Sequence, residues 1–262
     1  MFAHPPGKTI ILAFCSFGLS FMAQGCFSSP QVTGAASPKA SSSIANTRFT
    51  NSPSVPTPAD KAIPRYDHIF VLIEENKGYD QIIGNTDAPN INQLAHTYGL
   101  ASNFYGEVHP SEANYIALLG GSTFGIHDDD AYYCQPNDSD QFCSNSEQPD
   151  YVSHTVTAKS LLDQLQEKGL TWKGYFESIP APGSKVVVAP GKIRALYAVK
   201  HNGFLNFKNV QDDPDLPKKI VGLDQLASDL KGGKVPNYSH IVLNQCHEMH
   251  GLPECSNLKT IN

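Results

Sequence analysis

Residues 68–73, HIFVLI, run directly into EENKGYD at 74–80, and residues 239–244, SHIVLN, run directly into QCHEMHG at 245–251. A short apolar run that is rich in β-branched residues and lacks polar alternation predicts a strand buried on both faces, as in a parallel sheet. In open α/β sheets, ligands bind beyond the carboxyl ends of the strands. Because both runs end in carboxylate, amide and imidazole groups, the sequence predicts one active site that the two strand ends share.

The N-terminal 25 residues have the pattern of a signal peptide. Lys8 precedes an apolar stretch at 10–23 that is too short, and too interrupted by serine and glycine, to span a bilayer. A buried N-terminal helix is the alternative. The segment AQGC at 23–26 resembles a bacterial lipoprotein processing site, at which Cys26 would be lipidated, although such sites usually carry leucine where Ala23 stands. Lipidation and simple secretion both stay open, so we expect an exported protein that is secreted, periplasmic or lipid-anchored at the cell surface.

The composition separates a tether from a folded domain. Residues 26–63 are dominated by Ser, Pro, Ala, Thr and Asn, and such a segment buries too little apolar surface to offset its ordering entropy. We therefore expect a disordered tether at 26–63 and one folded domain at 64–262, which is long enough for a sizeable core. The net charge of -6 and the lack of a Lys/Arg cluster argue against nucleic acid as a partner.

Four of the six cysteines lie beyond the expected leader, and they form two local pairs. The spacing favours disulfides Cys134–Cys143 and Cys246–Cys255, because each pair closes a short polar loop and because exported proteins fold in oxidising compartments. The competing interpretation is a zinc site built from Cys246, His247, His250 and Cys255, although this spacing matches no common zinc pattern.

Helical and strand patterns alternate between the two end strands. The sequence predicts helices over 90–98, 157–168 and 223–230 and a further strand over 170–176. This alternation is typical of an α/β fold with a parallel sheet. Residues 125–153 predict an irregular surface excursion, in which the acidic run 128–130 is either a solvated surface or a calcium site.

A candidate nucleophile stands at the predicted start of one more helix. In HPSEANYIALLGG at 109–121, Ser111 occupies a favourable N-cap position ahead of the apolar run 115–119. Free N–H donors and the positive end of the helix dipole would stabilise an alkoxide there and would also bind a phosphate. Spacing alone favours the simpler interpretation that Ser111 only caps the helix.

Four motifs follow one another along the chain: ENKGYD at 75–80 with IIG at 82–84, HPSxxNY at 109–115, KHN at 200–202, and NQCxxMHG at 244–251. In this order they resemble the bacterial phosphoesterase family, which holds acid phosphatases and phospholipases C within the alkaline-phosphatase-like superfamily. The resemblance extends from about Tyr66 to the end of the chain. It implies a three-layer α/β/α sandwich around a largely parallel sheet.

The resemblance also implies roles for individual residues. Asn76 and Glu75 would ligate one divalent metal ion together with Ser111, which would also be the nucleophile. The substrate phosphate would be bound by Asn114, His201 and His109, and His250 would be a catalytic residue beside the phosphoryl group. The implied reaction is attack of the Ser111 alkoxide on phosphorus, which gives a phosphoserine that water then hydrolyses.

The sequence departs from the family pattern at several points. The family usually has proline where this chain has Ala113, and often where it has Gly203. It also completes its metal site with an Asp-Glu or Asp-Asp pair on a strand downstream of the His-Gly motif, and no such strand precedes Asn262. We therefore expect a domain that lacks its C-terminal part, either as a fragment or as a natural truncation that binds metal poorly.

The resulting hypothesis is an exported, metal-dependent phosphoric-ester hydrolase of acid-phosphatase type that acts on a small phosphorylated substrate. A phospholipase C-type phosphodiesterase is one alternative. A non-catalytic, surface-tethered relative that has lost its metal site and binds a ligand is another. A membrane is expected as a partner only through a lipid anchor at Cys26.

Overall fold

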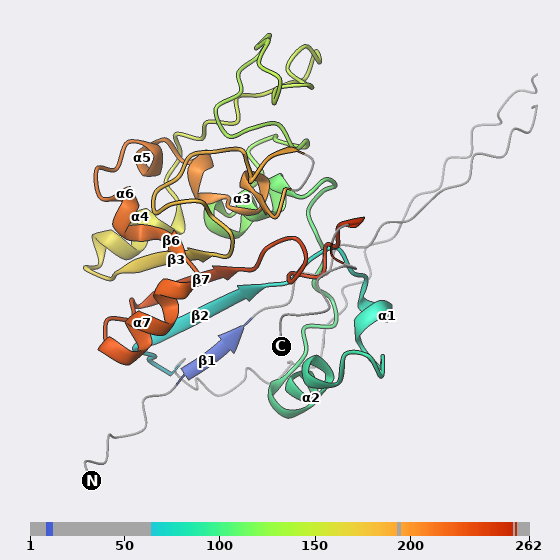
Figure 1. Ribbon diagram of the computed structural model, residues 1–262, viewed down its shortest axis with the longest axis vertical. Helices are drawn as coiled ribbons and strands as arrows, with labels where there is room; N and C mark the ends of the chain where they lie inside the picture. The colour runs from blue at the N-terminus through green and yellow to red at the C-terminus, as the bar shows by residue number, and fades with distance from the viewer. Residues whose placement is uncertain (1–8, 13–63, 193–194, 254, 256–262) are drawn as a thin grey trace, which may run out of the picture. The chain divides into compact units, whose positions relative to one another are not determined.

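The computed structural model describes residues 9–12, 64–192, 195–253 and 255. A five-stranded sheet with the order β1-β2-β7-β3-β6 forms the centre of the domain, and all of its strand pairs are parallel. Its strands are β1 (Thr9–Leu12), β2 (His68–Ile73), β3 (Trp172–Phe176), β6 (Ile220–Gly222) and β7 (Tyr238–Val242). Helices flank this sheet (Figure 1), so the prediction of an α/β/α sandwich around a largely parallel sheet is confirmed.

The two strands that run into the polar motifs, β2 and β7, are direct neighbours. β2 pairs with β7 from Ile69 opposite Tyr238 to Ile73 opposite Val242, so the residues that follow both strands lie at one edge of the sheet. β7 is almost wholly buried. β2 is only partly buried, and Ile69 keeps 38% of its surface exposed. The predicted burial on both faces is therefore wrong for β2.

The remaining elements are short. The helices are α1 (Tyr79–Ile82), α2 (Pro89–Tyr98), α3 (Glu112–Gly120), α4 (Leu161–Glu167), α5 (Lys208–Gln211), α6 (Leu216–Lys219) and α7 (Asp224–Gly232). Two 3₁₀ turns, η2 (Val199–His201) and η3 (Phe204–Asn206), follow a two-stranded antiparallel sheet of β4 (Val188–Ala189) and β5 (Tyr197–Ala198). No helix in the described part of the chain is long and apolar enough to span a bilayer.

Helix α4 begins later than the sequence pattern predicts. The pattern started at Thr157, whereas the helix starts after Ser160, whose hydroxyl accepts a hydrogen bond from the N–H of Leu162 at 3.2 Å. The Asp163 carboxylate in turn accepts the N–H of Ser160 at 2.8 Å, which completes a capping box. Val156, just upstream, forms an isolated parallel bridge to Phe207. The backbone at 157–159 is thereby held outside the helix.

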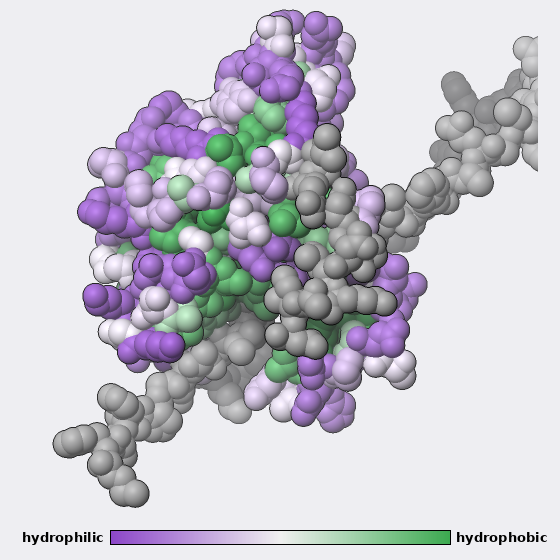
Figure 2. Space-filling model, in the orientation of Figure 1, coloured by the Kyte–Doolittle hydropathy of each residue, from purple (hydrophilic) through white to green (hydrophobic). Residues whose placement is uncertain are grey.

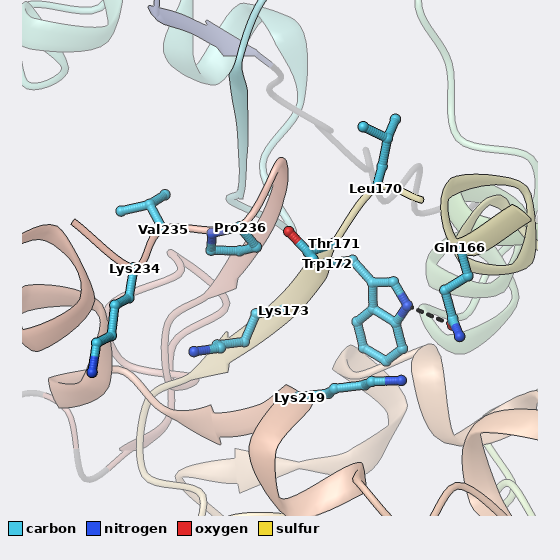
Figure 3. A pocket seen from close by; sticks show the side chains of 9 residues that line it. All are labelled: Gln166, Leu170, Thr171, Trp172, Lys173, Lys219, Lys234, Val235 and Pro236. Atoms are coloured by element: carbon cyan, nitrogen blue, oxygen red, sulfur yellow. Dashed lines mark hydrogen bonds between the residues drawn. The ribbon is translucent and has the colours of Figure 1, made fainter. Parts of the chain in front are cut away.

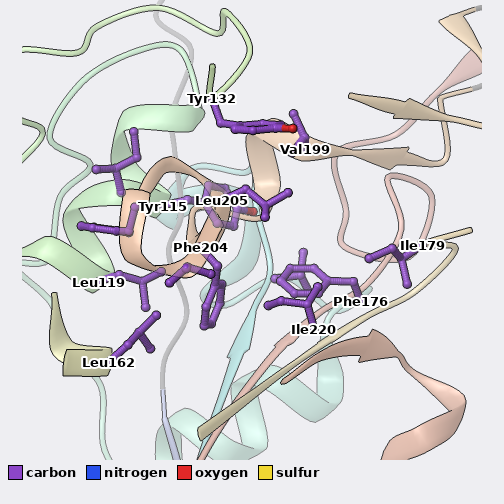
Figure 4. Packing of buried hydrophobic residues seen from close by; sticks show 14 of the residues in the cluster. Tyr115, Leu119, Tyr132, Leu162, Phe176, Ile179, Val199, Phe204, Leu205 and Ile220 are labelled. Atoms are coloured by element: carbon purple, nitrogen blue, oxygen red, sulfur yellow. The ribbon is translucent and has the colours of Figure 1, made fainter. Parts of the chain in front are cut away.

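Aromatic side chains join the sheet to the helices in the core. Phe204 of η3 is fully buried and contacts Phe176 of β3 edge to face, with ring centroids 5.9 Å apart. Leu119 of α3 and Leu162 of α4 lie in the same cluster (Figure 4). Dense packing of this kind fixes the position of α3 against the sheet, and α3 carries the candidate nucleophile at its start.

Residues 125–153 form the irregular excursion that the sequence predicted, and the disulfide Cys134–Cys143 holds it. The excursion has a small core of its own around both cysteines, Ala131 and Tyr151. Its outer end is largely hydrophilic on the face shown in Figure 2. The second predicted disulfide, Cys246–Cys255, is also present. Both pairings are confirmed, and the zinc interpretation that needs two free thiolates is wrong.

The N-terminal region contributes β1 alone to the described residues. β1 pairs in parallel with β2, from Thr9 opposite His68 to Leu12 opposite Val71, and it lies within the expected leader. The tether at 26–63 and Cys26 lie outside the described residues. The leader, the tether and the lipid anchor therefore stay predictions.

Candidate active site

The loops that follow β2 and β7 are joined at the carboxyl edge of the sheet. The N–H of Glu75 donates a hydrogen bond to the carbonyl of Glu248 at 2.8 Å. Asn76 follows Glu75 with a φ of 62°, a left-handed conformation that asparagine tolerates better than most residues. The backbone turns sharply at this point, and the Glu75 side chain stays buried beneath the turn.

Glu75, His201 and His250 form a compact cluster at this edge. One ligand atom from each side chain lies within 4.8 Å of the others. The Nε2 atom of His201 is 3.2 Å from Glu75 Oε2, and the Nε2 atom of His250 is 3.7 Å from Glu75 Oε1. Glu75 and His201 are buried, whereas the His250 side chain keeps 23% of its surface exposed. The cluster therefore reaches the surface through His250.

Two further buried side chains hold the cluster. The Tyr115 hydroxyl donates to Glu75 Oε2 at 3.1 Å, and the Tyr115 ring stacks on His201 at a centroid distance of 5.3 Å. On the other side of the imidazole, Glu248 Oε1 lies 2.7 Å from His201 Nδ1. His201 is thus oriented by a carboxylate behind it and presents its Nε2 atom to Glu75.

Gly203 permits this close packing of η2 and η3 on α3. It adopts a φ of +66°, and a Cβ atom there would lie 2.8 Å from the Tyr115 carbonyl oxygen. Proline, which the family often has at this position, is locked near a φ of −65° and cannot adopt this conformation. The departure from the family pattern therefore fits the local backbone of this chain.

Burial controls the protonation of the cluster. It lowers the pKa of His201 to about 4, against the opposing effect of the Glu75 charge, and it raises the pKa of Glu248 to about 8. His201 is therefore a neutral imidazole at neutral pH, and its Nδ1 atom lies 2.7 Å from Glu248 Oε1.

The cluster has the chemistry of a cation site. Glu75 Oε1 and His201 Nε2 are buried atoms that make no hydrogen bond within the described residues. Buried polar atoms without partners are costly, and a divalent cation would satisfy a carboxylate oxygen and two imidazole nitrogens together. A carboxylate behind a ligating histidine, as Glu248 stands behind His201, is a common support of such sites.

Ser111 lies at the start of α3 but does not cap it. The residue is half-buried, and its hydroxyl makes no capping hydrogen bond to the helix. One helical turn further on, Tyr115 contacts Glu75. The helix therefore links the serine to the cluster, and the cap interpretation loses the hydrogen bond on which it depends.

The other predicted phosphate ligands have different surroundings. Asn114 is buried, and its amide is engaged by the backbone: Oδ1 accepts the N–H of Glu107 at 2.8 Å, and Nδ2 donates to the Val108 carbonyl at 2.8 Å. His109, in the same loop, is exposed. In this structure Asn114 shapes the loop that precedes Ser111.

The Phosphoesterase family model matches residues 85–257, which is about two thirds of the chain. The chain belongs to the phosphoesterase family. The matched segment contains Ser111, Asn114, His201 and His250 and begins after Glu75. The resemblance that the four motifs carried is confirmed.

Curated relatives of this chain are phosphatases. It is 32% identical over 192 residues to a phosphatidylinositol-3-phosphatase of Mycobacterium tuberculosis, a match that covers 73% of this chain and 54% of the relative. It is 25% identical over 187 residues to a probable acid phosphatase of Kluyveromyces lactis, covering 71% of this chain and 39% of the relative. An acid phosphatase of Aspergillus fumigatus is 27% identical, with 71% and 37% covered. The chain thus spans about half, or less, of the length of these relatives.

Sequence reasoning missed three residues at this edge of the phosphoesterase sheet. Glu248 and Tyr115 contact the cluster directly. Glu177 follows β3 and accepts the N–H of Asn244 at 3.0 Å and a hydrogen bond from His247 Nδ1 at 2.8 Å. Glu177 had a signal, because it immediately follows a predicted strand. Tyr115 and Glu248 lie inside recognised motifs, but their burial depends on packing that the sequence does not show.

A separate pocket lies at the opposite end of the strands. It is lined by residues that precede or begin β3 and β7, among them Trp172, Lys173 and Pro236, and by Lys219 and Lys234 (Figure 3). Two of its lysines are already paired, Lys173 with Asp229 and Lys219 with Asp213, each at 2.6 Å. Because the candidate catalytic groups follow the strands at the other edge, this pocket lies away from the candidate active site.

The disulfide Cys246–Cys255 should affect the KM for a phosphate ester more than Cys134–Cys143 does. The first closes the loop that carries His250, and we expect the double variant Cys246→Ser/Cys255→Ser to raise the KM for a phosphate ester before the domain unfolds. Each bridge spans nine positions, so loop closure should stabilise both equally, by roughly 2–3 kcal/mol. The variant Cys134→Ser/Cys143→Ser is therefore a matched control. Equal changes in KM for the two variants would contradict a specific role for the Cys246–Cys255 loop.

Proposed function

We propose that this protein is an exported, metal-dependent phosphoric-ester hydrolase that cleaves phosphomonoesters with Ser111 as its nucleophile. The observation that carries the proposal is the buried cluster of Glu75, His201 and His250, tied through Tyr115 to the helix that Ser111 begins. Membership of the phosphoesterase family and the phosphatase names of its relatives support the reaction class. The signal-peptide pattern and the two disulfides support export.

A divalent metal ion fits the site, and Glu75, His201 and His250 would hold it, with Asn76 and Ser111 as the further ligands that the family resemblance implies. When bound, the ion supplies a positive charge that polarises the phosphoryl group and favours the ionised form of a nearby hydroxyl. The described residues do not include the acidic pair with which the family usually completes the site.

The side chains of the protein have separate tasks in the proposed reaction. Ser111 Oγ attacks phosphorus at the N-terminus of α3, where the positive end of the helix dipole favours the charge of the phosphate. The ester oxygen leaves with a proton, and water then cleaves the phosphoserine. His250 is the partly exposed member of the cluster, so it is the residue positioned to meet a phosphate that enters from solvent.

A phosphorylated inositol headgroup is a second substrate candidate. The observation that favours it is the 32% identity to a phosphatidylinositol-3-phosphatase. Aromatic side chains also stand exposed ahead of the nucleophile, including Phe104 at 51% and Tyr105 at 75% exposure. Such side chains suit the boundary between water and lipid.

Phosphate release from a panel of esters tests the proposal. We expect 4-nitrophenyl phosphate to be hydrolysed in the presence of a divalent metal and bis(4-nitrophenyl) phosphate to resist. Vesicles with phosphatidylinositol 3-phosphate test the inositol candidate. Preference for the diester would favour the phospholipase C-type alternative. Phosphate binding without hydrolysis of any ester would favour the non-catalytic alternative.

A further inference from the structure

The acidic run Asp128–Asp129–Asp130 is turned into the protein. Asp128 and Asp130 are only 8% and 2% exposed, so the interpretation of this run as a solvated surface is wrong. Asp130 accepts the backbone N–H of Asn145 at 2.9 Å and the side-chain amide of the same residue at 2.9 Å. It thereby anchors the run to the loop that follows Cys143. Asp129 contacts α3 directly, and Asp128 contacts it through His154.

Asp129 performs the capping task that Ser111 does not. Its Oδ1 atom accepts the N–H of Glu112, the first residue of α3, at 3.0 Å. That N–H is one of the donors that a helix leaves without an intrahelical partner at its start. A carboxylate also interacts favourably with the positive end of the helix dipole. A residue distant in sequence thus satisfies the helix terminus, and the Ser111 hydroxyl is left available for chemistry.

The same carboxylate holds a second part of the site. Asp129 Oδ2 binds Lys200 Nζ at 2.9 Å, and both side chains are about three quarters buried. Lys200 immediately precedes His201 in η2. One aspartate therefore fixes the residue after the proposed nucleophile, Glu112, and the residue before a cluster histidine, Lys200, which lie 88 positions apart in the chain.

Asp128 supports the same helix through a buried histidine. Its Oδ1 atom lies 3.1 Å from His154 Nε2, and His154 Nδ1 lies 3.2 Å from Glu112 Oε2. Burial alone would lower the pKa of His154, but Asp128 and Glu112 outweigh it and raise the pKa to about 10. Asn206 donates to the other Glu112 oxygen at 2.6 Å. Both the backbone and the side chain of Glu112 are therefore held by the acidic run.

We propose that Asp129 is a positioning residue for the reaction. By binding both Glu112 and Lys200, it fixes the position of Ser111 relative to His201. The proposal rests on the proposed function, because it assigns a partner to the proposed nucleophile. It concerns orientation, because the two hydrogen bonds by which Asp129 holds the site go to Glu112 and Lys200.

Two substitutions separate the contacts of Asp129. Asp129→Asn keeps an oxygen acceptor for the Glu112 N–H but removes the charge that Lys200 binds, and Asp129→Ala removes both contacts. We expect Asp129→Ala to lower kcat by roughly 100-fold, the size of loss that a misplacement of about 1 Å produces, with KM within about two-fold of wild type. The kcat of Asp129→Asn should lie between that of wild type and that of Asp129→Ala. The Ki of orthovanadate, a mimic of the transition state, should rise with the loss of kcat.

The control is Asp150→Ala, which removes a largely exposed carboxylate from the same excursion and should leave kcat unchanged. A kcat within two-fold of wild type for Asp129→Ala overturns the proposal. So does a loss of activity that merely follows the folded fraction measured by circular dichroism, with an unchanged Ki for vanadate. Wild-type protein that hydrolyses no ester, or Ser111→Ala protein that still does, overturns the proposed function instead and removes the basis of this inference.

Discussion

Ser111→Ala should reduce the turnover of 4-nitrophenyl phosphate by roughly 10⁴-fold or more, as removal of a nucleophile does in other hydrolases. The melting temperature should hardly change. Loss of a side-chain helix cap typically costs about 1 kcal/mol, but the Ser111 hydroxyl makes no such hydrogen bond. Initial-rate kinetics and thermal unfolding of the same preparation measure both quantities.

Ser160→Ala provides the opposite expectation and serves as the matched control. The Ser160 hydroxyl does cap its helix, by accepting the N–H of Leu162, so this variant should lose about 1 kcal/mol of stability and keep its activity. Retention of most activity by Ser111→Ala would remove the nucleophile assignment. A similar loss of stability in both variants would return Ser111 to the role of a cap.

The strand-ending motifs could be predicted from the sequence because their signal is local. An apolar run followed at once by polar residues identifies a buried strand and the point where it ends. Since parallel strands end at one edge, the neighbourhood of Glu75 and the 245–251 loop follows from the sheet type alone, and the pairing of β2 with β7 confirms it. The disulfides were equally local, because each joins cysteines nine positions apart.

The support of the site could not be predicted, because it depends on contacts between distant segments. Asp129 and Lys200 are 71 positions apart, and the Glu112 side chain meets Asn206 across 94. Any rule based on composition predicts that polar residues in an irregular segment are exposed to solvent. Only the packing of the excursion against α3 shows that the acidic run is buried and bonded.

The start of α4 differs from the prediction because apolar spacing does not show where helical hydrogen bonding begins. The apolar spacing of Leu161, Leu162 and Leu165 correctly located the helix, but a periodic pattern does not show where hydrogen bonding begins. The capping box of Ser160 and Asp163 decides that point, and the apolar spacing does not include it.

Glu75→Gln should lower the metal content of the purified protein sharply. The substitution keeps the size of the side chain but removes the carboxylate charge from the centre of the cluster, and a cation site depends on that charge. Metal that binds only the folded state stabilises it by about 2.7 kcal/mol at a hundred-fold excess over Kd. Wild-type protein should therefore melt at a lower temperature in EDTA, and Glu75→Gln protein should show little further change.

The metal content of three further variants distinguishes a metal ligand from residues that only lie near the metal site. Glu74→Gln alters the adjacent carboxylate, which lies outside the cluster, and should leave metal content unchanged. Glu248→Gln alters the carboxylate behind His201 and should weaken metal binding by roughly 10- to 100-fold. Asn76→Ala should lower metal content if that amide is the further ligand that the family resemblance implies.

Inductively coupled plasma mass spectrometry after dialysis gives the stoichiometry of bound metal. Full metal content in Glu75→Gln protein would contradict a metal site at this cluster, because no other group of His, Cys, Asp and Glu side chains in the described residues is close enough to hold the ion.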